Sequence, residues 1–148
     1  MEGMSTSEVT FVDTNVLLYA HDASETVKRP IARDALERLW ADGTGAISTQ
    51  VLQEFYVVAT RKLAVPMSRS EAREVVDVYS AWRVITIDPS IIIAASVLEA
   101  EHTLSFWDAL IVEAARIAGA SLLLSEDLQA GREIGGIRIQ NPFAVEPG

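Results

Sequence analysis

Short runs of apolar residues alternate along this chain with longer segments in which apolar residues recur every three or four positions. The short runs have the length of buried strands, and the longer segments have the periodicity of amphipathic helices. Strands are predicted at residues 9–12, 46–49, 83–87, 121–125 and 137–139. Helices are predicted at residues 16–20, 30–41, 49–63, 69–79, 91–98 and 106–118. The pattern therefore predicts a chain in which strands and helices alternate.

Residue types at the predicted helix ends support these boundaries. Thr14 or Asn15 can cap the first helix, because a short polar side chain there can accept hydrogen bonds from the first turn. Ser48 or Thr49 can cap the third helix in the same way. Further signals are a Ser68–Glu71 capping box, Asp88 before Pro89, and Gly119 after the helix at 106–118.

The alternation of strands and helices indicates the fold class. It predicts a parallel sheet with right-handed crossovers and helices on both faces, a three-layer α/β/α fold with short strands. In such folds the functional crevice lies beyond the carboxyl ends of the strands. No repeat or linker divides the sequence, so residues 9–148 are predicted to form one domain, preceded by a flexible polar tail at residues 1–8.

The composition excludes several classes of protein. The chain has 148 residues and no cysteine, so disulfides and thiolate metal sites are excluded. Its apolar runs are far shorter than the roughly 20 residues that a membrane span needs. We therefore expect a cytoplasmic protein that does not bind membranes. Its hydrophobic fraction of 49% favours an oligomer or a partner protein.

Four acidic residues lie where the predicted fold would bring them to one edge of the sheet. Asp13 and Asp127 follow predicted strands, whereas Glu54 and Asp108 lie on predicted helices. Clustered carboxylates repel one another unless protons or cations intervene, and hard divalent cations prefer all-oxygen ligands. The sequence therefore predicts a metal site formed by these four carboxylates.

Glu54 is predicted to point inward from its helix. Val51 lies three positions before it and Val58 four positions after it, which places Glu54 on the apolar stripe. A buried carboxylate needs a partner, a raised pKa or a metal. The alternative to a metal is a salt bridge with an arginine such as Arg61.

The other three acids also have simpler interpretations. Asp108 follows Ser105 by three positions, which is typical of a helix cap. Asp13 taken alone is typical of a turn or a cap, and Asp127 of a surface turn. The metal-site hypothesis therefore depends on all four carboxylates converging.

Basic residues are few, and the formal net charge is −9. This balance disfavours a broad nucleic-acid-binding face, because affinity for phosphates comes mainly from Lys and Arg. Two small clusters are candidates for phosphate contacts: Lys28, Arg29 and Arg33, and Arg61 with Lys62. Each of these residues is also typical of an ordinary solvated charge. The sequence thus predicts a narrow basic strip.

Residues 11–20, with the sequence FVDTNVLLYA, closely resemble the opening motif of PIN-domain ribonucleases, especially the toxins of VapBC-type toxin–antitoxin modules. Three later segments resemble the family's other motifs: STQVLQEFY around Glu54, SFWDALI around Asp108 and SEDL around Asp127. The segment NPF at residues 141–143 resembles the family's usual ending. The motifs are short, but their order and spacing over residues 9–143 are specific.

The resemblance implies an Mg²⁺-dependent endoribonuclease, with Mn²⁺ as a substitute, in which Asp13, Glu54, Asp108 and Asp127 are the catalytic and metal-binding residues. Thr14, Asn15 and Ser125 match supporting polar positions beside the metal. The implied substrate is structured RNA such as tRNA or rRNA. The implied role is that of a toxin inhibited by a cognate antitoxin protein, and we also expect a homodimer.

The residue types agree with metal-assisted hydrolysis. Asp13 and Asp108 are expected to bind the metal directly, and Glu54 to orient the attacking water or accept its proton. Two other functions remain open: a non-catalytic domain that keeps a metal for stability, and an Asp-based phosphoryl-transfer enzyme. The second needs cationic groups to hold the phosphoryl group, and no lysine follows Lys62.

Overall fold

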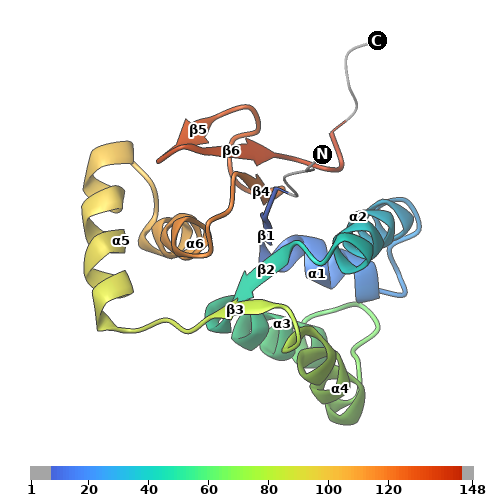
Figure 1. Ribbon diagram of the computed structural model, residues 1–148. Helices are drawn as coiled ribbons and strands as arrows, with labels where there is room; N and C mark the ends of the chain where they lie inside the picture. The colour runs from blue at the N-terminus through green and yellow to red at the C-terminus, as the bar shows by residue number, and fades with distance from the viewer. Residues whose placement is uncertain (1–7, 145–148) are drawn as a thin grey trace.

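A computed structural model describes residues 8–144 of the chain (Figure 1). Its elements are β1 (Thr10–Val12), α1 (Thr14–His21), α2 (Lys28–Asp42), β2 (Gly45–Ser48), α3 (Thr49–Arg61), α4 (Arg69–Tyr79), β3 (Arg83–Ile85), α5 (Pro89–His102), α6 (Phe106–Ile117), β4 (Leu122–Leu124), β5 (Glu133–Ile134) and β6 (Ile137–Gln140). The tail predicted at residues 1–8 lies outside the described residues, except for Glu8. Within residues 8–144, no helix combines the length and the apolar character that a membrane span requires.

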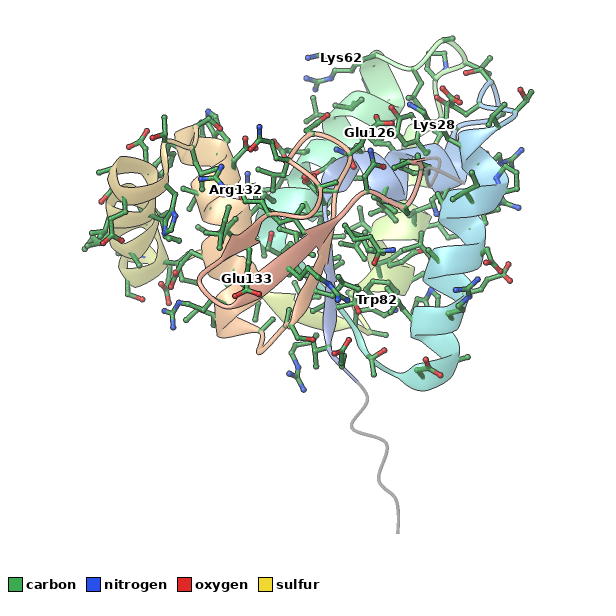
Figure 2. The ribbon with its side chains drawn as sticks, turned by 90° about the horizontal axis from the view of Figure 1, so that it is seen from above. Lys28, Lys62, Trp82, Glu126, Arg132 and Glu133 are labelled. Atoms are coloured by element: carbon green, nitrogen blue, oxygen red, sulfur yellow. The ribbon has the colours of Figure 1, made fainter. Side chains whose placement is uncertain are left out.

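The strands form one six-stranded sheet in the order β3-β2-β1-β4-β6-β5. All neighbours pair in parallel except β5, which is antiparallel to β6. Figures 1 and 2 show α5 and α6 on one side of the sheet and α1 and α2 on the other. The predicted α/β fold, a sheet of short, mostly parallel strands flanked by helices on both sides, is therefore confirmed.

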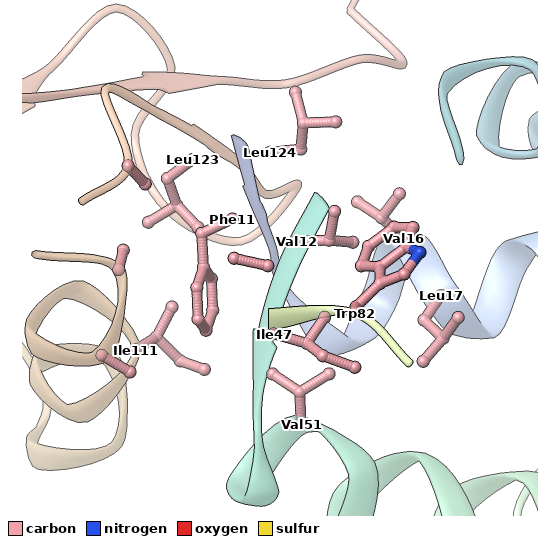
Figure 3. Close-up of a cluster of buried hydrophobic side chains, with 14 of the residues drawn as sticks. Phe11, Val12, Val16, Leu17, Ile47, Val51, Trp82, Ile111, Leu123 and Leu124 are labelled. Carbon is pink, nitrogen blue, oxygen red and sulfur yellow. The ribbon is translucent and has the colours of Figure 1, made fainter. Parts of the chain in front are cut away.

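The core explains why the strands are apolar at consecutive positions. Successive side chains of a strand point to opposite faces of the sheet. Phe11 accordingly packs on the same side as Leu123 and Ile111 of α6, whereas Val12 packs on the side of Val16 in α1 (Figure 3). Phe11, Val12 and Leu123 have no exposed surface. A sheet covered on both faces needs such uninterrupted apolar strands.

Most predicted element boundaries agree with the structure to within a few residues. The helix predicted at 91–98 is longer and spans Pro89–His102. Asp88 caps it and Pro89 begins it, as expected. The Ser68–Glu71 capping box is confirmed, and Gly119 adopts a positive φ of 77° after α6. The sequence prediction missed β5, because a strand of two residues is too short to show a periodic pattern.

The cap of α1 differs from the prediction. Asp13, and not Thr14 or Asn15, is the N-cap residue, with φ −75° and ψ 160°. Asp13 is the single residue between β1, which ends at Val12, and α1, which begins at Thr14, so Thr14 already lies in the helix. The predicted metal ligand is thus also the residue at which β1 ends and α1 begins.

Candidate metal centre

The candidate site lies where the strand order changes direction. From β1 the chain proceeds to β2 on one side, whereas β4 lies on the other side of β1. Crevices in open parallel sheets form at such switch points, beyond the carboxyl ends of the strands. Asp13 follows β1 and Ser125 follows β4, and the Asp13 N–H donates to the Leu124 carbonyl at 2.9 Å. The backbone therefore brings both residues to the same edge.

Asp13 is held by hydrogen bonds to both of its carboxylate oxygens. Oδ1 accepts from the Thr14 N–H at 2.7 Å, and Oδ2 accepts from the Ser125 hydroxyl at 2.7 Å. Asp13 is 7% exposed and Ser125 is fully buried. The two predicted supporting residues, at the start of α1 and after β4, therefore orient the carboxylate of Asp13.

The electrostatic environment of Asp13 disfavours its charge. Burial raises the pKa of its carboxyl to about 6, although the hydrogen bonds from Ser125 and Thr14 act in the opposite direction. The negative charges of Asp127 and Glu54 raise this pKa further. The three acids are thus electrostatically coupled, and a cation among them would relieve both burial and repulsion.

Glu54 lies on α3, whose N-terminus is capped by Ser48. The prediction that Glu54 is buried on the apolar stripe is wrong, because its side chain is exposed. Phe55 takes the fully buried position beside it. Glu54 borders the crevice instead, where its Oε1 accepts a hydrogen bond of 2.8 Å from the Thr14 hydroxyl. Thr14 therefore contacts Asp13 through its backbone and Glu54 through its side chain.

Asp108 lies in the first turn of α6, next to the helix cap and at the wall of the crevice. Its N–H donates to the Ser105 hydroxyl at 3.1 Å, which confirms the cap interpretation. Its half-buried side chain also lines the crevice. The N-terminal half of a helix dipole stabilises a carboxylate at this position. Gln50 of α3 donates to the carbonyl of the preceding residue, Trp107, and so ties α6 to α3.

Asp127 is exposed on the loop between β4 and β5. Two of the predicted supporting residues hold this loop. The Asn15 side-chain carbonyl accepts from the Glu126 N–H at 3.3 Å, and the Ser125 hydroxyl accepts from the Leu128 N–H at 3.3 Å. Asp127 lies between these two anchored residues and faces the same crevice as Asp13.

All four acids line one crevice of about 490 Å³. Its other walls are apolar and polar side chains of α1, α3 and α6, with a lysine among them: Leu18, Gln50, Gln53, Val57, Val58, Lys62, Trp107 and Ile111. Trp107 is 63% exposed. The crevice thus combines clustered carboxylates, apolar walls and one cation.

The donor atoms suit a hard divalent cation. They are carboxylate oxygens, and the chain has no cysteine to favour softer metals. In the part of the chain that the structure describes, no three His, Asp or Glu side chains lie close enough to one another to hold an ion. Asp13, Glu54, Asp108 and Asp127 fit Mg²⁺ or Mn²⁺ by chemistry and by their shared crevice.

The first predicted basic cluster has internal partners. Lys28 forms an ion pair with Glu126 and hydrogen-bonds the Tyr19 hydroxyl. Arg33 donates through Nε to a backbone carbonyl of α1 at 2.9 Å, and Arg29 is partly buried. Contacts of these residues with RNA stay predictions, but Lys28 already has an anionic partner within the protein.

The second predicted basic cluster lies at the C-terminal end of α3. Arg61 is the last residue of the helix and Lys62 is its C-cap. Both are exposed, and Lys62 lines the crevice that holds the acids. This arrangement favours Lys62 over Lys28 as a phosphate contact.

Sequence reasoning missed the contacts of Tyr19 and the structural role of Glu126. Tyr19 donates from its hydroxyl to Glu126 Oε1 at 2.6 Å, across 107 positions of the chain. No local pattern predicts a contact over that separation. The nearest signal was Glu126 itself, an extra acid beside Asp127 that the metal-site hypothesis did not need.

Comparison with known proteins matches the chain to a family. The family model of the PIN domain matches residues 10–132. A comparison with curated protein sequences gave no match.

Several solved structures share this fold. A toxin–antitoxin complex from Klebsiella pneumoniae has a TM-score of 0.69 at 22% identity, over 92% of this chain and 99% of that chain. Mycobacterium tuberculosis VapC20, described as a toxin that cleaves the sarcin–ricin loop, has a TM-score of 0.63 at 22% identity, over 80% of this chain and 89% of its own. DNA-bound VapBC from Salmonella typhimurium has a TM-score of 0.64 at 20% identity, over 91% of this chain and 98% of that chain. At these identities the likeness shows the fold.

Proposed function

Because the chain belongs to the PIN-domain family, we propose that it is a metal-dependent endoribonuclease and the toxin of a toxin–antitoxin pair. The observation that carries this proposal is Asp13. It is buried at the switch point of the sheet, its pKa is raised to about 6, and its crevice contains three further carboxylates. A buried carboxylate with like charges around it is typical of a metal-binding active site.

The residues of the crevice have separate roles in the proposed reaction. Asp13 and Asp108 would bind Mg²⁺ or Mn²⁺, with Asp127 completing the site. The ion would supply Lewis-acid stabilisation of the phosphate and lower the pKa of a bound water. Ser125 and Thr14 hold the Asp13 carboxylate in a fixed orientation by hydrogen bonds. These contacts keep the ligand arrangement preorganised.

Glu54 is proposed as the group that accepts a proton from the attacking water. Its exposed carboxylate can meet a water molecule in the crevice, which a buried group could not do as readily. The Thr14 hydroxyl donates to one oxygen, Oε1, and so orients the other toward a proton donor. The exposed position of Glu54, although it differs from the predicted burial, therefore suits a proton acceptor.

RNA is proposed as the substrate, with tRNA and rRNA as the first candidates. Lys62 lies about 12 Å from Glu54 along α3, at roughly 1.5 Å per residue. A phosphate close to the scissile one along the strand can therefore reach Lys62. Trp107, beside Asp108, offers an exposed ring on which an unpaired base can stack. The printed description of VapC20 as a toxin that cleaves the sarcin–ricin loop supports this substrate class.

An antitoxin and a second copy of the chain are proposed as partners. Solved structures with this fold include toxin–antitoxin assemblies. Ile92, Ile93 and Val97 are exposed on α5, a helix that is apolar around most of its circumference and that packs mainly on α6. A helix of this kind favours coverage by a further protein surface.

The proposed function is tested by incubating the purified chain, freed of any bound partner, with total RNA and Mg²⁺ or Mn²⁺. EDTA and the variant Asp13→Asn are the negative controls, and Asp42→Asn, at the exposed end of α2, is the matched substitution outside the crevice. We expect discrete cleavage sites with the wild type and Asp42→Asn only. A folded chain that binds Mn²⁺ but cuts no RNA would instead support the non-catalytic metal-binding alternative.

A further inference from the structure

Lys28 and Glu126 form an ion pair at the edge of the crevice. Lys28 begins α2, and Glu126 lies on the loop after β4, directly before Asp127. The Lys28 Nζ and Glu126 Oε2 atoms lie 2.5 Å apart. Figure 2 labels both residues in the view from above. The pair therefore links α2 to the loop that carries a predicted metal ligand.

Two aromatic rings enclose this ion pair. The Lys28 ammonium lies 4.6 Å from the Tyr19 ring centroid and 5.7 Å from the Phe143 ring centroid. The two rings contact each other edge to face at 5.1 Å, and the Tyr19 hydroxyl donates to the second oxygen of Glu126. The side chains of Lys28 and Glu126 are 34% and 22% exposed. Both oxygens of Glu126 are thus engaged in a partly enclosed setting, unlike those of a typical surface pair.

The backbone of the same loop is fixed from α1 and β4. The Glu126 N–H donates to Asn15, and the Ser125 hydroxyl contacts both Asp13 and the Leu128 N–H. Residues 125, 126 and 128 are therefore each attached, and Asp127 projects from between them. The side chain of Asp127 is exposed, so its position depends on these attachments of its neighbours.

We propose that the Lys28–Glu126 pair is a positioning clamp, which holds Asp127 beside Asp13 for metal binding, and that Lys28 is not an RNA contact. The inference rests on the proposed function. Repulsion among the crevice acids favours an outward movement of Asp127, and an unpaired Glu126 would add another negative charge. Lys28 neutralises that charge and attaches the loop to α2.

The clamp is tested by measuring Mn²⁺ affinity with calorimetry on the full chain. Lys28→Met is expected to weaken Mn²⁺ binding by about tenfold, the lower end of the effect of removing an outer-shell partner of a metal site. Glu126→Gln keeps the side-chain shape and the hydrogen bond with Tyr19 but removes the charge, so it tests the clamp even if Lys28→Met does not fold. Arg38→Met, which breaks an exposed ion pair with Asp34, is the matched control and should leave affinity unchanged.

Charge reversal separates the clamp from a direct contact with RNA. The double variant Lys28→Glu with Glu126→Lys should recover most of the Mn²⁺ affinity that either single reversal loses. Thermal unfolding in EDTA monitors the fold, so that lost affinity in a stable variant reports positioning of Asp127 and not general destabilisation. RNA affinity is compared between the inactive Asp13→Asn variant and the same variant that also carries Lys28→Met. The two affinities should differ little.

Three results would overturn the proposal in different ways. Equal Mn²⁺ affinity of the wild type and both single variants would refute the clamp and leave the nuclease assignment intact. Loss of RNA affinity in Lys28→Met with normal Mn²⁺ binding would make Lys28 an RNA contact. A wild-type chain that neither binds Mn²⁺ nor cleaves RNA would refute the proposed function, and the clamp with it.

Discussion

Ser125 donates a hydrogen bond of 2.7 Å to Asp13 across 112 positions of the chain. The bond joins the residues that follow β1 and β4, neighbouring strands of the sheet. Because Oδ1 of Asp13 is already held by the Thr14 N–H, the bond from Ser125 fixes the second oxygen. The fold therefore orients this carboxylate from the start of α1 and from the loop after β4 at once.

Replacing Ser125 with alanine is expected to destabilise the chain. The change leaves the buried Asp13 oxygen and the Leu128 N–H without their partner, and an unsatisfied buried group costs about 1–3 kcal/mol. Ser121→Ala is the matched control, because the buried Ser121 hydroxyl has no hydrogen-bond partner among the described residues. Urea unfolding at pH 7 measures both variants, and equal losses of unfolding free energy would contradict the prediction.

Replacing Asp13 with asparagine is expected to stabilise the metal-free chain at neutral pH. The folded state raises the pKa of Asp13 from 3.8 to about 6, so its ionisation above pH 6 costs about 3 kcal/mol of folding free energy as an upper estimate. Asparagine removes that cost. The gain should vanish as the pH falls below 4, where Asp13 is protonated in both states. Unfolding in EDTA between pH 4 and 8 tests this, with Asp42→Asn as the control.

His21 is expected to give the opposite pH dependence. Burial, with Arg33 and Arg29 nearby, lowers the pKa of His21 from 6.5 to about 4. The unfolded chain therefore binds this proton more tightly, so stability is lost as the pH falls from 6.5 toward 4. His21→Phe, in a pocket where the ring already meets Phe55 and Tyr79, should gain stability relative to the wild type over that window.

The check for His21 is the difference in unfolding free energy between variant and wild type at pH 7 and pH 4.5. His102→Gln, at the end of α5, is the control. A difference that does not change with pH would show that His21 does not titrate in this window.

The local parts of the fold could be predicted from sequence, because strands and caps are specified by neighbouring residues. The Ser68–Glu71 capping box and the Asp88 cap each lie within four positions, and both agree with the structure. Asp13 could also be placed at the sheet edge, because a carboxylate directly after a strand has no other location. Prediction succeeded where a short segment determines its own conformation.

The burial of Glu54 could not be predicted in this way. Its neighbours Val51 and Val58 do mark an apolar side of α3, but Val58 lines the crevice and only Val51 is fully buried. A helical stripe can therefore border a solvent-filled crevice as well as the core. Periodicity identifies the stripe, whereas only the positions of α1 and α6 decide which part of it is covered.

Metal binding is expected to depend on pH through Asp13. Protons compete with the cation for a carboxylate whose pKa is about 6, so Mn²⁺ affinity should fall as the pH decreases from 7.5 to 5.5. At an ion concentration of 100 times Kd, binding to the folded state alone adds about 2.7 kcal/mol of stability. The measurement is the shift of Tm with Mn²⁺ at both pH values. Asp108→Asn should abolish the shift, and a pH-independent shift would contradict a role for Asp13.

Lys62 is expected to contribute one phosphate contact to RNA binding. Lys62→Ala in an inactive Asp13→Asn background should weaken binding of all RNA sequences alike, and it should reduce the slope of log K against log salt by about one. Lys62 has this effect because it lines the crevice with the acids, whereas Arg38 lies on α2 in an exposed ion pair. Arg38→Ala is therefore the matched control for loss of one positive charge. Equal slopes for Lys62→Ala and Arg38→Ala would show that net charge, and not a contact in the crevice, determines RNA affinity.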